Sequence, residues 1–106
     1  MHIEVLRLSP GDDLRGALEQ AWAALSVTHG VQAGCVVSAV GSLDGAVLRY
    51  AAQPQGTRIT GALELLTLQG TFSANGVHLH ARVARADGTV LGGQLMPGCT
   101  VRTTAE

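Results

Sequence analysis

The chain has 106 residues, the length of one ordinary domain and enough to bury a hydrophobic core. Its formal net charge is −1, and its seven basic residues are all arginines scattered along the chain, which argues against direct DNA binding because nucleic-acid affinity draws on clustered positive charge. The apolar runs are short and interrupted by glycine, so no membrane span is expected.

The N-terminal residues and the two cysteines indicate a reducing setting. Residues 1–5 show no basic start followed by an apolar run, so we expect no signal peptide and a cytoplasmic location. Cys35 and Cys99 are far apart in the sequence and have neither metal-binding nor redox spacing. Both are therefore predicted to be reduced, buried thiols.

The first elements predicted are a strand and a helix. Alternating apolar residues predict a strand over about residues 2–8. Asp12 or Asp13 can cap a helix that carries one apolar stripe to about Thr28, and His29–Gly30 is a suitable end. Trp22 lies on that stripe, where a core or interface role is expected.

A glycine-rich segment follows the helix. Residues 33–43 are expected to form a strand that is buried on both faces, with small residues that let a ligand or another backbone approach closely. Asp44–Gly45 predicts a turn, residues 46–51 a further strand, and residues 53–57 a polar loop.

Residues 58–72 are predicted to be extended, with a change of apolar face near the middle that indicates a bulge. Glu64 is a lone carboxylate inside this apolar run. A solvated or hydrogen-bonding Glu64 is favoured over a catalytic one, because an inward-pointing carboxylate needs a partner.

Two hairpins complete the pattern. Asn75–Gly76 and Asp87–Gly88 are favoured hairpin turns, and they enclose a strand on which His78 and His80 share one face. The second hairpin is expected to bring Gln94 near this histidine pair. With a last strand over residues 99–104, the sequence predicts one α+β domain, residues 1–106, with one main helix packed on a strongly curved, mostly antiparallel sheet of about seven strands.

The order of these motifs resembles the plants-and-prokaryotes conserved (PPC) domain. The resemblance covers essentially the whole chain, through the segments Leu8–Leu14, Ser38–Leu43, Gly61–Gly70, His78–His80, Gly92–Leu95 and Thr103–Glu106. It implies an α+β fold and a homotrimer. In plants the domain follows AT-hook motifs in DNA-binding proteins and mediates self-association; the stand-alone prokaryotic forms have no assigned biochemical role.

The resemblance also bears on metal binding. Many prokaryotic members have a histidine where this chain has Gln94, and that imidazole together with the His-x-His pair is similar to a metal site. Only His78 and His80 carry over as candidate ligands of zinc or another divalent metal, because an amide oxygen is a much weaker ligand. The other interpretation is that the two histidines hydrogen-bond within the domain or line a subunit cleft.

Three functions remain open on this basis. The first is a non-catalytic trimeric module that associates with itself and binds a protein partner or small ligand, with regulation as one role open to it. Its candidate residues are Ser38, Gly41, Ser42, Glu64 and Gln94. The alternative is a metal-binding protein or metal-dependent enzyme that uses His78 and His80. The third is DNA binding by the assembled oligomer, although the AT-hook pattern is absent. No nucleophile has a sequence-visible base, so an enzyme is not the favoured reading.

Overall fold

The computed structural model describes all 106 residues and contains one helix and six strands. All strand pairings are antiparallel, and the strand order is β1-β3-β4-β5-β2-β6. The α+β class is confirmed, with six strands in place of about seven. The elements are α1 (Leu14–His29), β1 (Gly34–Cys35), β2 (Gly41–Arg49), β3 (Thr57–Ser73), β4 (Gly76–Arg85), β5 (Val90–Leu95) and β6 (Val101–Ala105).

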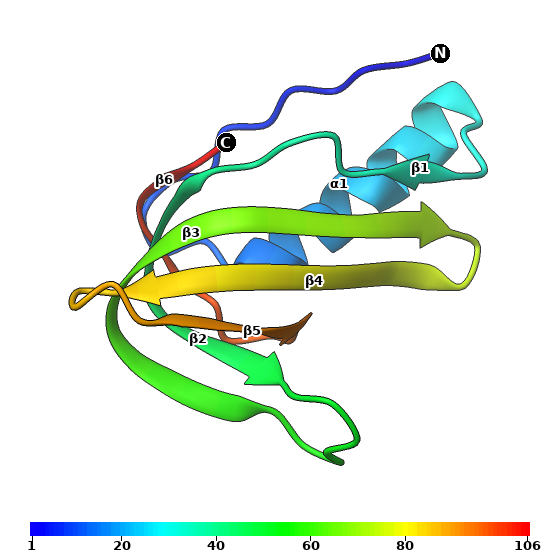
Figure 1. Ribbon diagram of the computed structural model, residues 1–106. Helices are drawn as coiled ribbons and strands as arrows, with labels where there is room; N and C mark the ends of the chain where they lie inside the picture. Colours follow the sequence, from blue (N-terminus) through cyan, green and yellow to red (C-terminus); the bar gives the residue numbers. More distant parts are fainter.

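The long strand β3 gives the sheet its strong curvature. Its first part pairs with β2 and its second part with β4, while β5 joins β4 back to β2 (Figure 1). The sheet therefore curls back on itself. The predicted bulge is present, because the β3–β4 register shifts between Leu65 and Thr67. Gly61 has a φ of +95°, which a residue with a side chain rarely adopts.

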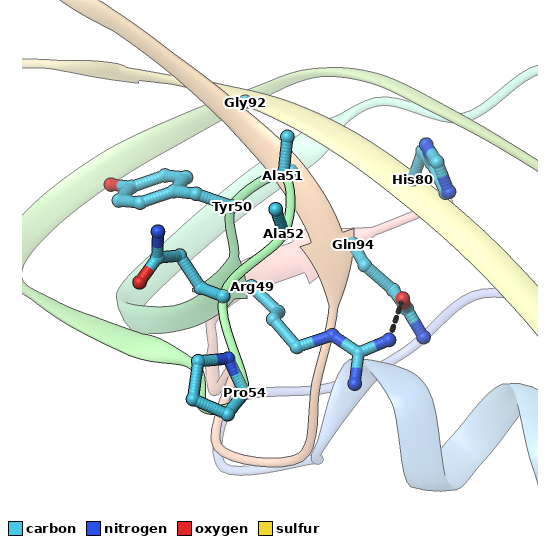
Figure 2. Close-up of a pocket in the computed structure, with 10 residues that line it drawn as sticks. Arg49, Tyr50, Ala51, Ala52, Pro54, His80, Gly92 and Gln94 are labelled. Carbon is cyan, nitrogen blue, oxygen red and sulfur yellow. Dashed lines mark hydrogen bonds between the residues drawn. The ribbon is translucent and has the colours of Figure 1, made fainter.

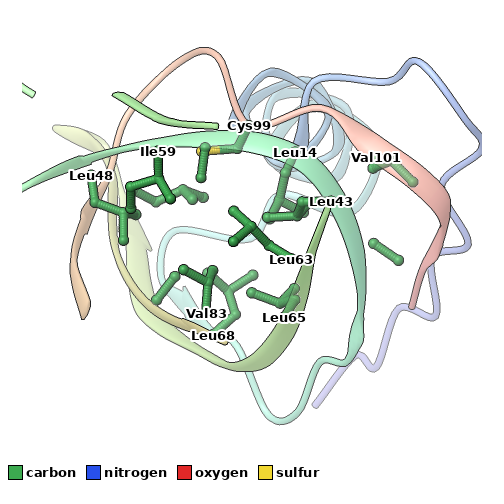
Figure 3. Close-up of a cluster of buried hydrophobic side chains, with 14 of the residues drawn as sticks. Leu14, Leu43, Leu48, Ile59, Leu63, Leu65, Leu68, Val83, Cys99 and Val101 are labelled. Carbon is green, nitrogen blue, oxygen red and sulfur yellow. The ribbon is translucent and has the colours of Figure 1, made fainter. Parts of the chain in front are cut away.

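Leucine side chains fill the inside of the curled sheet (Figure 3). Leu43, Leu48, Leu79 and Leu95 are fully buried, and no buried polar side chain lies among them. Burial of one leucine side chain contributes about 1.5–3 kcal/mol to stability. The core therefore accounts for the alternating pattern of the strands, in which one face is apolar and the other is polar.

Helix α1 begins and ends as its sequence predicts. Asp13 is the N-cap, and Gly30 follows the last helical residue with a φ of +62°. Trp22 is half-buried; its ring stacks on Phe72 with 5.5 Å between centroids, and its Nε1 donates a hydrogen bond to the Ser73 carbonyl at 3.1 Å. Trp22 thus joins the helix to the end of β3.

The predicted strand over residues 2–8 is wrong. Residues 1–7 have no secondary structure and make no backbone–backbone hydrogen bond, and only Leu8 forms an isolated bridge, with Ala105. The alternating pattern suits an extended conformation, but no strand of this chain pairs with residues 1–7 to form a hydrogen-bond ladder.

The segment after the helix also differs from expectation. The predicted strand over residues 33–43 is interrupted: Gly34 and Cys35 form β1, residues 36–40 belong to no strand, and β2 begins at Gly41. Val37 is 87% exposed where the pattern predicts a strand buried on both faces. Cys35 is exposed as well, so only Cys99 confirms the buried-thiol prediction. Asp44–Gly45 is a bulge inside the continuous strand β2, because Gly45 takes a φ of +81° while the strand continues.

Both predicted hairpins are present, joining β3 to β4 and β4 to β5, but the first loop is Ala74–Asn75 in place of Asn75–Gly76, because Gly76 pairs with Ser73 and begins β4. The Asp87–Gly88 turn is closed by hydrogen bonds from the Gly88 N–H to the Arg85 carbonyl at 2.8 Å and from the Arg85 N–H to the Thr89 carbonyl at 2.9 Å. The helix of this chain is too short and too polar to be a candidate membrane span.

Candidate functional site

A row of polar residues crosses the outer face of the sheet. The backbone registers place Gln69, His80, Gln94 and Arg49 next to one another on β3, β4, β5 and β2. Leu79 lies next to His80 in the sequence but points into the core. The predicted proximity of Gln94 to the histidine pair is therefore confirmed as a direct strand pairing with His80.

The two histidines contact each other. Nε2 of His78 lies 3.1 Å from Nε2 of His80, and the ring centroids are 4.9 Å apart in an edge-on arrangement. Both side chains are exposed. One ring therefore donates its Nε2 proton to the other, and one nitrogen of each imidazole is used in this contact.

Gln94 is held by an arginine from the neighbouring strand. Arg49 Nη2 donates a hydrogen bond to Gln94 Oε1 at 2.6 Å, and both residues are partly buried (Figure 2). Because a guanidinium group only donates, the amide oxygen must face Arg49 and the amide NH2 must face away from it. This contact fixes the orientation of the Gln94 side chain.

The row borders a hollow of about 660 Å³. Figure 2 shows β5 on one side of it and the turn that follows Arg49 on the other. Ala52 in that turn has a φ of +60°, a left-handed conformation that costs a non-glycine residue about 1–2 kcal/mol. The lining residues are Arg49, Tyr50, Ala51, Ala52, Gln53, Pro54, His80, Gly92, Gly93 and Gln94.

The other predicted site residues lie elsewhere on the sheet. Ser42 and Glu64 are cross-strand neighbours on β2 and β3, and neither lines the hollow. Ser42 Oγ accepts the Thr103 N–H at 3.1 Å, and Glu64 is exposed with no side-chain hydrogen bond or ion pair. Glu64 therefore has the solvated position that the sequence favoured.

Gly41 and Ser38 flank the same part of the sheet. A Cβ atom on Gly41 would lie 2.6 Å from the Thr104 carbonyl oxygen and 2.7 Å from the Ala105 Cα. The absent side chain thus lets β6 approach β2, which explains Gly41 without a ligand. Ser38 is exposed in the segment between β1 and β2 and does not line the hollow.

The side chains of this site do not fit a resident zinc ion. No group of three His, Cys, Asp or Glu side chains gathers anywhere in the structure. His78 and His80 come together, but the Gln94 oxygen that would be the third ligand accepts from the Arg49 guanidinium. A cation at that oxygen would be repelled by the arginine.

Cys99, the one buried thiol, belongs to the core. Its Sγ accepts the Val47 N–H at 3.3 Å and lies 3.3 Å from the Met96 carbonyl oxygen, to which it donates. Burial raises the pKa of the Cys99 thiol, and the low thiolate content makes it a poor nucleophile. The hydrogen-bond partners of the Cys99 thiol are all backbone groups, so no side chain that could act as a base contacts it through a hydrogen bond.

Arg49 and the turn at residues 50–54 are the parts of the hollow that sequence reasoning missed. Arg49 ends an apolar strand as a single basic residue, which carries no motif. The position of Arg49 beside Gln94 results from the pairing of two strands far apart in the sequence, since β2 and β5 meet only at Leu48–Leu95 and Arg49–Gln94. That register depends on the bulges and cannot be counted from either strand alone.

Comparison with known families identifies the chain over its full length. The model of the Plants and Prokaryotes Conserved (PCC) domain matches residues 1–106. A curated relative, the bifunctional protein GlmU of Synechococcus sp. (strain JA-2-3B'a(2-13)), is 47% identical over 106 residues, which is 100% of this chain. The chain spans 16% of the length of that relative.

Two solved structures share the fold. A hypothetical protein from Salmonella enterica is 41% identical with a TM-score of 0.83, and the match covers 94% of this chain and 70% of that one. A metal-containing protein from Archaeoglobus fulgidus is 29% identical with a TM-score of 0.71, over 94% of this chain and 72% of that one. The similarity to both extends over nearly the whole curled sheet.

Proposed function

The chain belongs to the Plants and Prokaryotes Conserved (PCC) domain family, and from that premise we propose that it is a non-catalytic module of the cytoplasm that forms a homotrimer and binds a small ligand or a protein partner. Self-association is the central part of the proposal. It rests on the unpaired, apolar segment at the N-terminus of the chain.

Residues 1–7 are suited to pairing with a second copy. They make no backbone–backbone hydrogen bond, so their N–H and C=O groups are free to add to another strand. Ile3 is 72% exposed and Val5 is 86% exposed, on the same side of an extended chain. Burial of these side chains against another subunit would remove apolar surface from water.

A second exposed segment, residues 36–40, supports the same interpretation. Val37 and Val40 are exposed, and Val40 exchanges two backbone hydrogen bonds with Glu106, at 3.0 and 2.9 Å. In Figure 1 this segment and the N-terminal segment both run along the top of the molecule, far from the turn at residues 50–54. A net charge of −1 gives little repulsion between copies.

Two further observations support a binding module. The hollow beside Gln94 offers a site for a small ligand on a face separate from the two exposed apolar segments. In the Synechococcus relatives the matching region is 16% of the chain, as expected of a module joined to other domains.

Native mass spectrometry on protein purified without chelator or metal-affinity resin tests the proposal. A trimer is expected at micromolar concentration. Val37→Asp combined with Ile3→Asp should shift the trimer toward monomer, because both place a charge in the proposed contact. Val90→Asp is the control. Val90 is also exposed, at 50%, but it lies next to the Asp87–Gly88 turn and belongs to neither of the two segments proposed to form the contact.

Three outcomes would count against the proposal. A monomer at all concentrations would remove self-association. A stoichiometric metal that is lost in a His78→Ala variant would favour the metal-binding alternative despite the engaged Gln94 oxygen. Salt-sensitive retardation of duplex DNA by the oligomer would favour the third alternative, since phosphate contacts strengthen at low salt.

A further inference from the structure

The hollow beside Gln94 contains cationic and donor groups but no carboxylate. Its ten lining residues include one arginine and one histidine and no Asp or Glu. The three ion pairs of the structure are His2–Glu4, Arg15–Glu19 and Arg102–Asp44, and none of them includes Arg49. The charge of Arg49 is therefore not neutralised by the protein.

Arg49 keeps free hydrogen-bonding capacity. A guanidinium group has five N–H donors, and the structure uses one of them, Nη2, for the bond to Gln94 Oε1. This bond also restricts the arginine side chain, so less conformational entropy is lost when a ligand binds. The remaining N–H groups can engage two oxygens of one oxyanion at once.

Gln94 adds a donor group on the neighbouring strand, and His80 lies beside it. The Gln94 oxygen faces Arg49, so its NH2 group is left to donate, and no protein group accepts from it. His80 lies next to Gln94 in the strand register, and its contact with His78 uses only one ring nitrogen. Arg49 and Gln94 thus present donors to a common ligand, and none of the three side chains is negative.

The rest of the lining suits an organic body. Ala51, Ala52 and Pro54 come from the turn after β2 and supply small apolar groups (Figure 2). The volume of about 660 Å³ exceeds what an inorganic ion needs and falls in the range of small-molecule sites. The lining therefore joins an oxyanion-binding part to an apolar part.

We propose that this hollow binds a small organic anion, with its carboxylate or phosphate held by Arg49 and Gln94 and its apolar body against Pro54 and the neighbouring alanines. The inference rests on the small-ligand role proposed above and names the class of ligand. An anion site is incompatible with a metal site at the same place, since the arginine that engages Gln94 attracts anions and repels cations.

The test is a titration of isotope-labelled protein with three matched probes at constant ionic strength. Benzoate and phenyl phosphate carry the two oxyanions on one ring, and benzyl alcohol is the neutral counterpart. Backbone amide NMR signals of Gly92 and Gly93 report on the hollow. We expect saturable shifts with at least one anion below about 10 mM, a range typical of small fragments.

Two arginine variants separate a specific site from general charge attraction. Arg49→Gln should weaken binding of the anion about tenfold or more, because a charge-assisted hydrogen-bond pair is lost. Arg82→Gln should change it less than about twofold, because Arg82 is exposed on the same face but does not line the hollow. The relative affinities of the two anions distinguish carboxylate from phosphate.

Three results would overturn the inference: no saturable shift with either anion, equal binding of benzyl alcohol, or an Arg49→Gln variant that binds as tightly as the parent. The subunit number of each sample is measured in parallel by native mass spectrometry. A trimer without anion binding would refute the inference alone, and a monomer that binds the anion would refute only the proposed self-association.

Discussion

Asp13 and Gly98 are joined by a hydrogen bond that spans 85 positions of the sequence, since Asp13 Oδ1 accepts the Gly98 N–H at 2.8 Å. The other oxygen, Oδ2, accepts the Gly16 N–H, also at 2.8 Å, and so caps α1. One carboxylate therefore fixes both the start of the helix and the turn that leads into β6.

Asp13→Ala should lower the free energy of unfolding by about 1–3 kcal/mol, because it removes a helix cap and a second, long-range hydrogen bond. Chemical denaturation monitored by circular dichroism measures the change. Asp44→Ala is the control, since its 3.7 Å pair with Arg102 is exposed and should contribute less than about 1 kcal/mol. Equal effects of the two variants would contradict this account of Asp13.

Gly41→Ala should destabilise the sheet by about 2 kcal/mol or more, because the added Cβ would overlap backbone atoms of β6 that cannot move independently. Thermal unfolding measures the loss. In the matched variant Gly34→Ala the nearest atom to the new Cβ is Trp22 Cζ3 at 3.5 Å, an ordinary contact. Gly34→Ala should therefore be tolerated, and a similar loss in both variants would show that the close approach of β6 is not the cause.

The two thiols should differ in reactivity in the folded protein. Cys35 is exposed and should be alkylated quickly at pH 8. Burial raises the pKa of Cys99, so less of it is thiolate at a given pH, and access is blocked as well. Mass spectrometry after iodoacetamide treatment should show one added group, and none in a Cys35→Ser variant until denaturant is added. Rapid double labelling without denaturant would contradict the buried position of Cys99.

Phe72→Ala should reduce stability by about 1–2 kcal/mol and shift the fluorescence of the single tryptophan to longer wavelength, because it removes the ring on which Trp22 packs. Tryptophan emission and denaturant titration report the two effects on one sample. Thr71→Ala, at the exposed neighbouring position, is expected to leave both unchanged. An unchanged emission spectrum in Phe72→Ala would contradict the stacking.

The elements that local patterns specify were predictable from the sequence. The cap at Asp13, the glycine after the helix, and the hairpins that contain Asn75 and Asp87 each follow from the chemistry of a few adjacent residues. The pattern predicts a strand over residues 2–8 and a buried strand at Val37, and both predictions are wrong because an apolar pattern does not reveal whether a partner lies beside it.

The candidate site divides in the same way. The proximity of His78, His80 and Gln94 followed from strand alternation and one hairpin, which are local rules. The contribution of Arg49 did not, since it depends on a short ladder between β2 and β5 that only the folded sheet creates. Ser42 and Glu64 became neighbours by strand pairing, but away from the hollow.

The length of β3 affects how the sheet unfolds locally and how fast the chain folds. One strand carries hydrogen bonds to β1, β2 and β4, so we expect the two halves of the sheet to open together. Amide protons of Leu63 and Leu68 should therefore exchange with deuterium only through opening of the entire sheet. With so many contacts between distant residues, the chain is expected to refold in milliseconds to seconds, slower than a helical domain of similar size.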